Sequence, residues 1–149
     1  MLETADGTYS FERTDEVIIV DIDGTIALRG NRDPYDLTSV SQDKPNITVI
    51  DILDILNSGT HCERVFVSGR SEVCRAETTK WLEEQGFMYP ILFMRKSNDY
   101  RADEVVKKEI YETKILPAKV WCVFDDRNRV VKMWRELGLT CLQVAEGDF

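Results

Sequence analysis

The sequence lacks the features that place a protein in or across a membrane. It contains no run of about 18 consecutive apolar residues, the length that a membrane-spanning helix needs. Its first residues, MLETADGTYSFERTDE, have neither the basic start nor the apolar middle of a secretory signal peptide. We therefore expect a cytoplasmic protein with no membrane partner.

The sequence also has little that would bind zinc. Its cysteines (Cys62, Cys74, Cys122 and Cys141) show no CxxC spacing, and the single histidine, His61, stands beside only one of them. A structural zinc site needs about four such ligands in a tight pattern. The cysteines are therefore interpreted as reduced thiols of a cytosolic protein.

Positive charge is scarce. Lysine and arginine total 19 against 27 aspartates and glutamates, which gives a net charge of −8. A protein that coats nucleic acid relies on many phosphate contacts, so this balance argues against that class but not against a site for one phosphate. No GxxxxGK[ST] motif occurs, so the phosphate-binding loop of P-loop kinases is absent from the sequence.

The sequence does contain apolar runs that alternate with helical patterns. Strands are predicted at Val17–Val20, Arg64–Val67, Pro90–Met94, Val120–Phe124 and Cys141–Val144, and helices at Thr48–Asn57, Glu72–Gln85, Asp103–Lys114 and Asn128–Leu137. Such alternation is typical of a doubly wound α/β fold with a mostly parallel sheet. A chain of 149 residues is long enough for one domain, which we place at residues 16–149 after a flexible segment at residues 1–15.

Local signals add detail to this prediction. Gly59, Gly86 and Gly138 fall just after predicted helices, where a left-handed cap favours glycine. The segment Ala27–Pro45 is the longest irregular stretch, and loops of that length are often functional.

The three tryptophans are expected in the core. Trp134 has helical spacing with its apolar neighbours, Trp81 stands beside a leucine in a predicted helix, and Trp121 lies within a predicted strand.

Polar side chains follow three of the predicted strands. The first ends in Asp21 and Asp23, the second in Ser68, Gly69 and Arg70, and the fourth in Asp125 and Asp126. Each group alone fits a loop start or a helix N-cap equally well. Three such groups at the carboxyl edge of one sheet, where α/β folds bind ligands, favour a site instead. Carboxylates about 4 Å apart repel by about 1 kcal/mol or more, and Mg²⁺ with a phosphate offsets this repulsion.

As a set, these motifs resemble those of a known family. DIDGT resembles the DxDGT motif of haloacid-dehalogenase (HAD) phosphohydrolases, VSGR resembles their second motif, and the DD pair resembles their acidic metal-binding motif. RGNRDPYDL, RADEVVKKEIY, DDRNRVVKMWRELG and CLQVAEGDF resemble the phosphatase domain of bacteriophage polynucleotide kinase-phosphatase. The resemblance implies a HAD-like sheet with the strand order 5-4-1-2-3. Core elements occupy the sequence between the motifs, so no large cap domain is expected.

The resemblance implies a role for each matching residue. Asp21 would be the nucleophile that forms an aspartyl-phosphate, and Asp23 the general acid and then the base. Lys107 would bridge nucleophile and phosphate, with Lys108 as the alternative register. Substrate contacts would come from Thr25, Arg32, Ser68, Gly69, Arg70 and Asp103, and Mg²⁺ ligands from Asp21, Asp23, Asp125 and Asp126. For Arg32 and Asp103, a solvated loop arginine and a helix N-cap are alternative interpretations.

The leading hypothesis is a Mg²⁺-dependent polynucleotide 3′-phosphatase that makes 3′-hydroxyl ends on DNA or RNA for repair. A HAD phosphatase for nucleotides or other small esters is the alternative. A receiver-like phospho-acceptor module is a third reading, disfavoured because Lys107 precedes the late acidic pair. The resemblance implies nucleic-acid 3′-phosphate ends as partners, with a separate kinase or ligase and a homodimer as further options. Without the kinase motif, the chain is either a stand-alone phosphatase or an excised domain.

Overall fold

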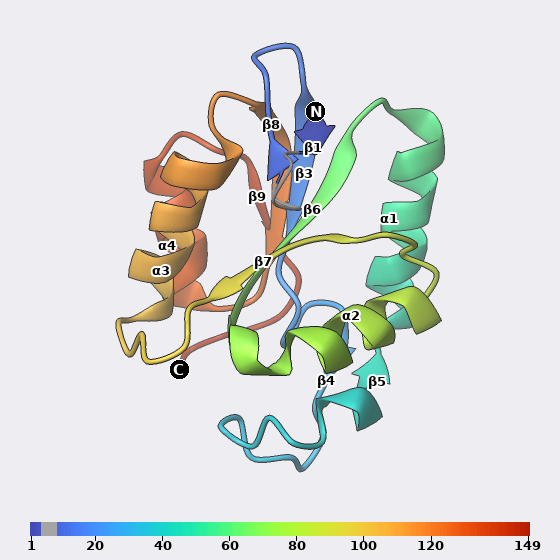
Figure 1. The fold of residues 1–149 in the computed structure, drawn as a ribbon, viewed down its shortest axis with the longest axis vertical. Coiled ribbons are helices and arrows are strands. Elements are labelled where there is room, and N and C mark those ends of the chain that lie inside the picture. The colour runs from blue at the N-terminus through green and yellow to red at the C-terminus, as the bar shows by residue number, and fades with distance from the viewer. Residues whose placement is uncertain (4–8) are drawn as a thin grey trace.

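The computed structural model describes residues 1–3 and 9–149, and a five-stranded parallel sheet forms its centre (Figure 1). The strand order is β7-β6-β3-β8-β9. The strands span Glu16–Val20 (β3), Glu63–Ser71 (β6), Ile91–Arg95 (β7), Lys119–Asp125 (β8) and Cys141–Gln143 (β9). When these five strands are numbered along the chain and read from the β9 edge, the order is 5-4-1-2-3. The predicted doubly wound α/β topology is therefore confirmed.

Helices cover both faces of the sheet, α1 and α2 on one face and α3 and α4 on the other (Figure 1). They span Ile47–Gly59 (α1), Arg75–Glu84 (α2), Asp103–Ile110 (α3) and Asn128–Glu136 (α4). A short 3-10 helix, η2 (Glu72–Cys74), leads into α2, and a π-helical turn (Tyr111–Ile115) continues α3. Strands buried on both faces read as continuous apolar runs, which is why VIIV was recognisable from the sequence.

One predicted helix end is wrong. Gly59 is the last residue of α1 and does not adopt a positive φ, whereas Gly86 and Gly138 do, at 91° and 81°. The backbone N–H and the hydroxyl of Thr60 both donate to the carbonyl of Leu56, at 2.9 and 2.7 Å. These bonds satisfy the carbonyl of Leu56 with Thr60 in an extended conformation, so the helix ends without a left-handed residue.

One predicted core residue is also wrong. Trp81 and Trp134 are buried, but Trp121 is 46% exposed. In the pairing of β3 with β8, Val17 faces Val120 and Ile18 faces Cys122, so Trp121 has no partner. It is the extra residue of a β-bulge, and a bulge turns its side chain out of the alternating pattern that the prediction assumed.

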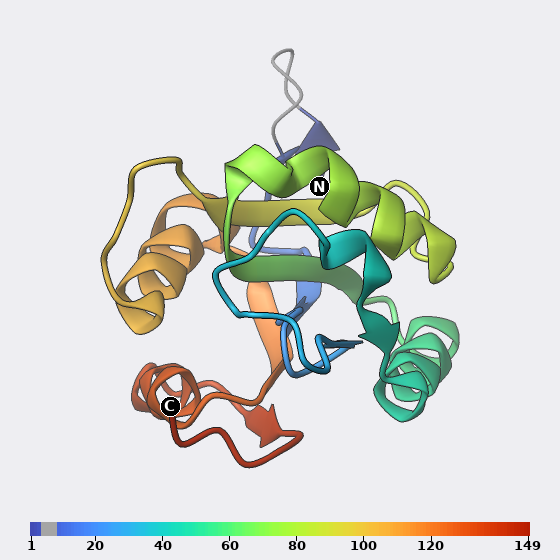
Figure 2. The ribbon, with the colours of Figure 1, turned by 90° about the horizontal axis from the view of Figure 1, so that it is seen from below.

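The segment after β3 lies across the carboxyl edge of the sheet, as Figure 2 shows from below. Strands β4 (Ala27–Leu28) and β5 (Lys44–Pro45) pair antiparallel and close this segment, which also contains the 3-10 helix η1 (Val40–Gln42). In the part of the chain that the structure describes, no segment forms a separate cap domain. Among those residues there is also no helix with the length and apolar character needed to span a bilayer.

Part of the N-terminal segment that was predicted to be flexible is described. Strands β1 (Leu2–Glu3) and β2 (Tyr9–Ser10) pair antiparallel, and Phe11 is buried in the core on the α3–α4 face. Residues 4–8 lie outside the described residues. The flexibility of residues 1–15 therefore stays a prediction.

Candidate active site

A buried lysine joins two aspartates at the carboxyl edge of the sheet. Asp21 follows β3 directly, and Asp125 ends β8, the neighbouring strand. The Nζ of Lys107, on α3, donates to Asp21 Oδ1 at 2.6 Å and to Asp125 Oδ2 at 2.9 Å. Lys108 is exposed on the same helix and lies 3.9 Å from Glu112. Of the two registers considered, the structure therefore brings Lys107 to the aspartates.

The third aspartate of the group, Asp126, approaches the turn after β3. One carboxylate oxygen each from Asp21, Asp125 and Asp126 lie within 4.8 Å of one another. Gly24 has a φ of 82°, and a Cβ added to it would lie 2.0 Å from Asp126 Oδ2. Glycine is therefore required for both the turn and the space. Thr25, predicted as a substrate contact, donates its hydroxyl to Asp21 Oδ2 at 2.9 Å.

The charges in this group are not balanced. Three buried carboxylates face one ammonium group. Burial, and then the neighbouring Asp125, raise the pKa of Asp21 well above its ordinary value, and the same two causes raise the pKa of Asp126. Burial alone would lower the pKa of Lys107, but Asp125 and Asp21 outweigh it and the net shift is upward.

A hard divalent cation fits this group. All three candidate ligands offer carboxylate oxygens, which are the donors that Mg²⁺ prefers. The unbalanced negative charge would be offset by such a cation. Asp23 was also predicted as a ligand, but its carboxylate is outside the group and paired with arginine. Its place in the metal site stays a prediction.

Asp125 is held from three directions besides Lys107. The indole Nε1 of Trp134, in the core, donates to Asp125 Oδ2 at 3.2 Å. The backbone N–H groups of Asp126 and Arg127 donate to Oδ1 at 2.9 and 3.3 Å. The side chain therefore has a fixed orientation, which a metal ligand needs.

Strand β6 supplies Ser68, Gly69 and Arg70 through an irregularity. In its pairing with β7, Ser68 faces Met94 and Ser71 faces Arg95, so Gly69 and Arg70 have no partners. This bulge turns Arg70 toward the end of β3, and its backbone N–H donates to Ser68 Oγ at 3.1 Å. Ser68 and Arg70 are both buried.

Two arginines meet the carboxylate of Asp23. Arg70 donates from Nε to Oδ2 at 2.9 Å and from Nη2 to Oδ1 at 2.8 Å. Arg32 approaches Oδ1 with its Nη2 at 3.4 Å. The Asp23 side chain is 38% exposed, whereas that of Asp21 is 7% exposed, so the two acids have different surroundings. Arg32 is thus not a solvated loop arginine.

Asp103 belongs to a neighbouring network at the rim of the site. Its two carboxylate oxygens accept bonds from Arg95 and Arg127, and the Nε of Arg95 also donates to the carbonyl of Gly69 at 2.8 Å. A Cβ on Gly69 would lie 2.5 Å from Asp103 Oδ1. The residue caps no helix by its side chain, because the N-cap of α3 is Ala102. Its predicted substrate contact stays a prediction.

Sequence reasoning missed Asp43. It is buried at the end of the segment after β3 and accepts bonds from both Arg32 and Arg70. Its only sequence signal was its place in the long irregular stretch. The indole donor of Trp134 was also missed, because helical spacing predicts burial but not what the ring N–H contacts.

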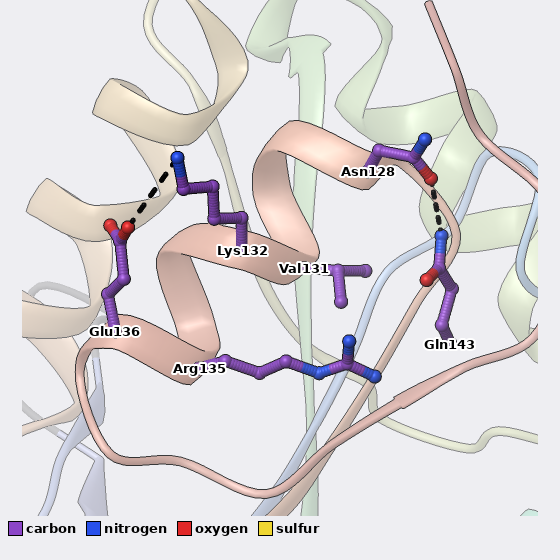
Figure 3. A pocket seen from close by; sticks show the side chains of 6 residues that line it. All are labelled: Asn128, Val131, Lys132, Arg135, Glu136 and Gln143. Carbon is purple, nitrogen blue, oxygen red and sulfur yellow. Dashed lines mark hydrogen bonds and ion pairs between the residues drawn. The ribbon is translucent and has the colours of Figure 1, made fainter.

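A shallow cavity of about 550 Å³ lies outside this site, between α4 and β9 (Figure 3). Asn128, Val131, Lys132, Arg135, Glu136 and Gln143 line it. Their polar side chains already have partners: Gln143 Nε2 donates to Asn128 Oδ1, Lys132 pairs with Glu136, and Arg135 donates to the carbonyl of Cys141. None of the predicted site residues lines this cavity.

The fold and the residues gathered at its carboxyl edge are those of a HAD-type phosphatase. A family model described as the phosphatase domain of polynucleotide kinase PNKP matches residues 15–149. The chain therefore belongs to this family of phosphatase domains.

Similar proteins agree with this assignment. A putative bifunctional polynucleotide kinase/RNA ligase of Autographa californica nuclear polyhedrosis virus is 37% identical over 123 residues, which is 80% of this chain and 18% of the viral protein. A solved structure of a Pnkp1/Rnl/Hen1 complex has a chain with a TM-score of 0.87 and 38% identity, covering 93% of this chain and 49% of that one. A second structure, of the Pnkp1/Rnl/Hen1 RNA repair complex, has a TM-score of 0.87 and 37% identity, and covers all of this chain.

This chain is shorter than its relatives. It spans about half the length of the two matched Pnkp1 complex chains and less than a fifth of the viral protein. A class C acid phosphatase from Bacillus anthracis, solved with tungstate, has a TM-score of 0.54 at 18% identity and so shows a likeness of fold only.

Proposed function

We propose that the chain is a Mg²⁺-dependent polynucleotide 3′-phosphatase that acts through an aspartyl-phosphate on Asp21. The observation that carries the proposal is the contact of Lys107 with both Asp21 and Asp125, beside Asp126, in a chain of this phosphatase family. A nucleophilic carboxylate, a cation for the phosphate and a set of hard oxygen ligands are thus adjacent. Phosphoryl transfer needs this combination of positioning and charge stabilisation.

In the first step, an oxygen of Asp21 attacks the phosphorus and forms the new P–O bond. The bond from phosphorus to the 3′ oxygen of the nucleoside breaks, and Asp23 gives a proton to that oxygen. In the second step, Asp23 takes a proton from water, the water oxygen attacks the phosphorus, and the bond from phosphorus to the Asp21 oxygen breaks. Inorganic phosphate leaves, and Asp21 and Asp23 return to their starting states.

The surroundings of the two acids suit these roles. Asp21 is buried beside Lys107, which fixes one of its oxygens, and Thr25 fixes the other. The more exposed Asp23 can reach a leaving group and water. Mg²⁺, held by Asp21, Asp125 and Asp126, would neutralise the phosphate charge that develops in the transition state. Ser68, Arg70 and Lys107 would hold the phosphate oxygens.

A polynucleotide end is the substrate that a site without a cap domain favours. The described residues contain no cap domain, and it is the segment after β3 that lies across the carboxyl edge of the sheet (Figure 2). Relatives described as a polynucleotide kinase/RNA ligase and as part of an RNA repair complex support action on nucleic-acid ends. They also support a separate ligase or kinase as a functional partner.

Small phosphate esters are the alternative substrates. A site without a cap domain would also admit a nucleotide, because charge-assisted hydrogen bonds to its phosphate are about twice as strong as neutral ones. A receiver-like role has little support in a chain that belongs to a phosphatase family.

The test is phosphate release from matched oligonucleotides. One carries a 3′-phosphate and its twin carries a 5′-phosphate, and a nucleoside 3′-phosphate serves as the small ester. With Mg²⁺ present, the 3′-phosphorylated strand should be the preferred oligonucleotide, and Asp21→Asn should abolish release. Equal release from both ends would favour the small-ester phosphatase instead.

A further inference from the structure

A buried carboxylate that no catalytic role requires joins the two arginines of the site. Asp43 Oδ1 accepts from Arg32 Nε at 2.8 Å, and its Oδ2 accepts from the Nη2 atoms of Arg32 and Arg70, at 2.8 and 2.9 Å. The same two Nη2 atoms also reach Asp23 Oδ1, at 3.4 and 2.8 Å. Two carboxylates therefore hold the same pair of guanidinium groups.

The two carboxylates differ in accessibility. The side chain of Asp43 is 2% exposed and that of Asp23 is 38% exposed. The contacts of the arginines with Asp43 are therefore the more deeply buried of the two sets, and those with Asp23 are the ones that an entering phosphate would replace.

We propose that Asp43 is a positioning residue that presets Arg32 and Arg70 as a paired phosphate clamp. The inference rests on the function proposed above and deepens it. Two guanidinium groups held side by side repel each other, and the buried charge of Asp43 offsets that repulsion. Groups that are already oriented bind with a smaller entropic cost.

The position of Asp43 is itself fixed. Its backbone carbonyl accepts the indole N–H of Trp81, from α2, at 2.8 Å. Arg70 Nη1 donates to Thr78 of the same helix at 3.1 Å. Arg32 Nη1 donates to the carbonyl of Asp36 at 2.7 Å, which ties the segment after β3 to the clamp. The clamp is thus supported by a helix on one side and by that segment on the other.

The test compares Asp43→Asn with the wild-type protein. The amide keeps the shape of the side chain and removes its charge. Inorganic phosphate is the probe, measured as a competitive inhibitor of p-nitrophenyl phosphate hydrolysis and by calorimetry with Mg²⁺. We expect the inhibition constant of phosphate and the KM for the ester to rise together, by about ten-fold or more, with a smaller change in kcat.

Asp54→Asn is the matched control. Asp54 also pairs with an arginine, Arg64, at 3.1 Å, but lies on α1 away from the site. This variant should keep the phosphate affinity of the wild type. If Asp43→Asn lowers the thermal midpoint but leaves phosphate affinity unchanged, Asp43 is only structural and the proposal is overturned.

A double-mutant cycle tests the route of the effect. If Asp43 acts through the arginines, its substitution should change phosphate affinity less in an Arg32→Ala background than in the wild type. Fully additive effects would overturn the proposal. If Asp43→Asn does not fold, Asp43→Glu keeps the charge but moves it. Weakened phosphate binding in that variant supports positioning, and wild-type binding rejects it.

Calorimetry separates this proposal from the proposed function. Calorimetry measures phosphate binding without turnover. If the protein hydrolysed no ester, the proposed phosphatase function would be refuted. The comparison of Asp43→Asn with Asp54→Asn would still decide whether Asp43 presets the clamp.

Discussion

The Nζ of Lys107 lies 2.6 Å from Asp21 Oδ1, although the two residues are 86 positions apart in the sequence. Both side chains are almost fully buried, at 3% and 7% exposure. A buried charge is stable only when it is paired, and removing one partner costs more than the pair contributes. The lysine therefore cannot be exchanged for a neutral residue without consequence for the acids around it.

We expect Lys107→Gln to lower phosphatase activity by about 10²–10³-fold, the usual cost of removing one group that stabilises transition-state charge. The measurement is kcat/KM on a 3′-phosphorylated oligonucleotide. Lys108→Gln is the control, because that side chain is exposed and its ion pair, at 3.9 Å, is with the exposed Glu112. The opposite pattern, with Lys108 required and Lys107 dispensable, would mean that the functional lysine is misassigned.

Asp21→Asn should abolish turnover and yet stabilise the metal-free protein near neutral pH. Burial and Asp125 raise the pKa of Asp21, so the folded protein binds this proton more tightly than the unfolded chain does. The free energy of unfolding therefore falls as pH rises from the ordinary aspartate range through the raised pKa. Asparagine carries no such charge, and Lys107 keeps its bond to Asp125 at 2.9 Å, so its own charge stays paired. Each 1 kcal/mol regained raises the midpoint by about 2–4 °C.

The measurement is the thermal unfolding midpoint of the wild type and of Asp21→Asn, in the presence of a chelator and at pH values from 4 to neutral. We expect the two midpoints to differ by about a few degrees near neutral pH. The gain of Asp21→Asn over the wild type should grow with pH. Adding Mg²⁺ should raise the midpoint of the wild type more than that of the variant. A gain that is the same at every pH would show that ionisation of Asp21 is not its cause.

The sheet could be predicted because its strands are apolar on both sides. The run from Val17 to Val20 identifies a central strand without any knowledge of its neighbours, and the acids after it mark the carboxyl edge. Spacing alone could not identify the bulge that exposes Trp121, because a bulge is a property of the pairing of two strands. The end of α1 was misplaced because Thr60 caps it where a glycine was expected.

Some residues of the candidate site could likewise be predicted from the sequence, and others could not. Asp21 follows β3, Asp125 ends β8, and Ser68 is the last paired residue of β6 before its bulge, so the topology of one sheet brings them together. Asp43 has no such signal, because its partners Arg32 and Arg70 come from a loop and from a bulge. The network that it forms depends on how the segment after β3 folds back, which neither periodicity nor turn chemistry specifies.

Gly24→Ala should weaken the binding of Mg²⁺. The new Cβ would lie 2.0 Å from Asp126 Oδ2, so the carboxylate has to move. Gly30→Ala is the matched control, since Gly30 also has a positive φ, 60°, but nothing lies within 4 Å of an added Cβ. Both variants should lose about 1–2 kcal/mol of stability from backbone strain.

Only Gly24→Ala should require more Mg²⁺ for half-maximal activity, which a metal titration of the rate measures. If the two variants required similar Mg²⁺ concentrations, the contact of Gly24 with Asp126 would not be important for metal binding. The comparison thus isolates the contact with Asp126 from the effect of the turn.

Asp23→Asn should affect natural and activated esters differently. General acid catalysis contributes about 10²–10⁴ in rate when the leaving group is a poor one such as a ribose hydroxyl. A p-nitrophenolate leaving group needs little protonation, so its first step should survive. The second step should remain slow, because the base that activates water is missing. Rapid-quench measurement should show a burst of p-nitrophenol without a burst from the oligonucleotide, and equal bursts would contradict the assignment.

Arg32→Ala should lower activity on a 3′-phosphate by about ten- to a hundred-fold. A hydrogen bond to a charged group in a mostly dry site contributes about 1.5–3 kcal/mol, whereas an exposed ion pair contributes about 0–1 kcal/mol. The side chain of Arg32 is 7% exposed and already contacts Asp43 and Asp23, so the first value applies. Arg29→Ala, an exposed change on the same segment, should leave kcat/KM within about two-fold of the wild type. Steady-state kinetics of the two variants on one oligonucleotide decide the matter. If they behave alike, the segment after β3 takes no part in binding the phosphate, and the clamp is reduced to Arg70.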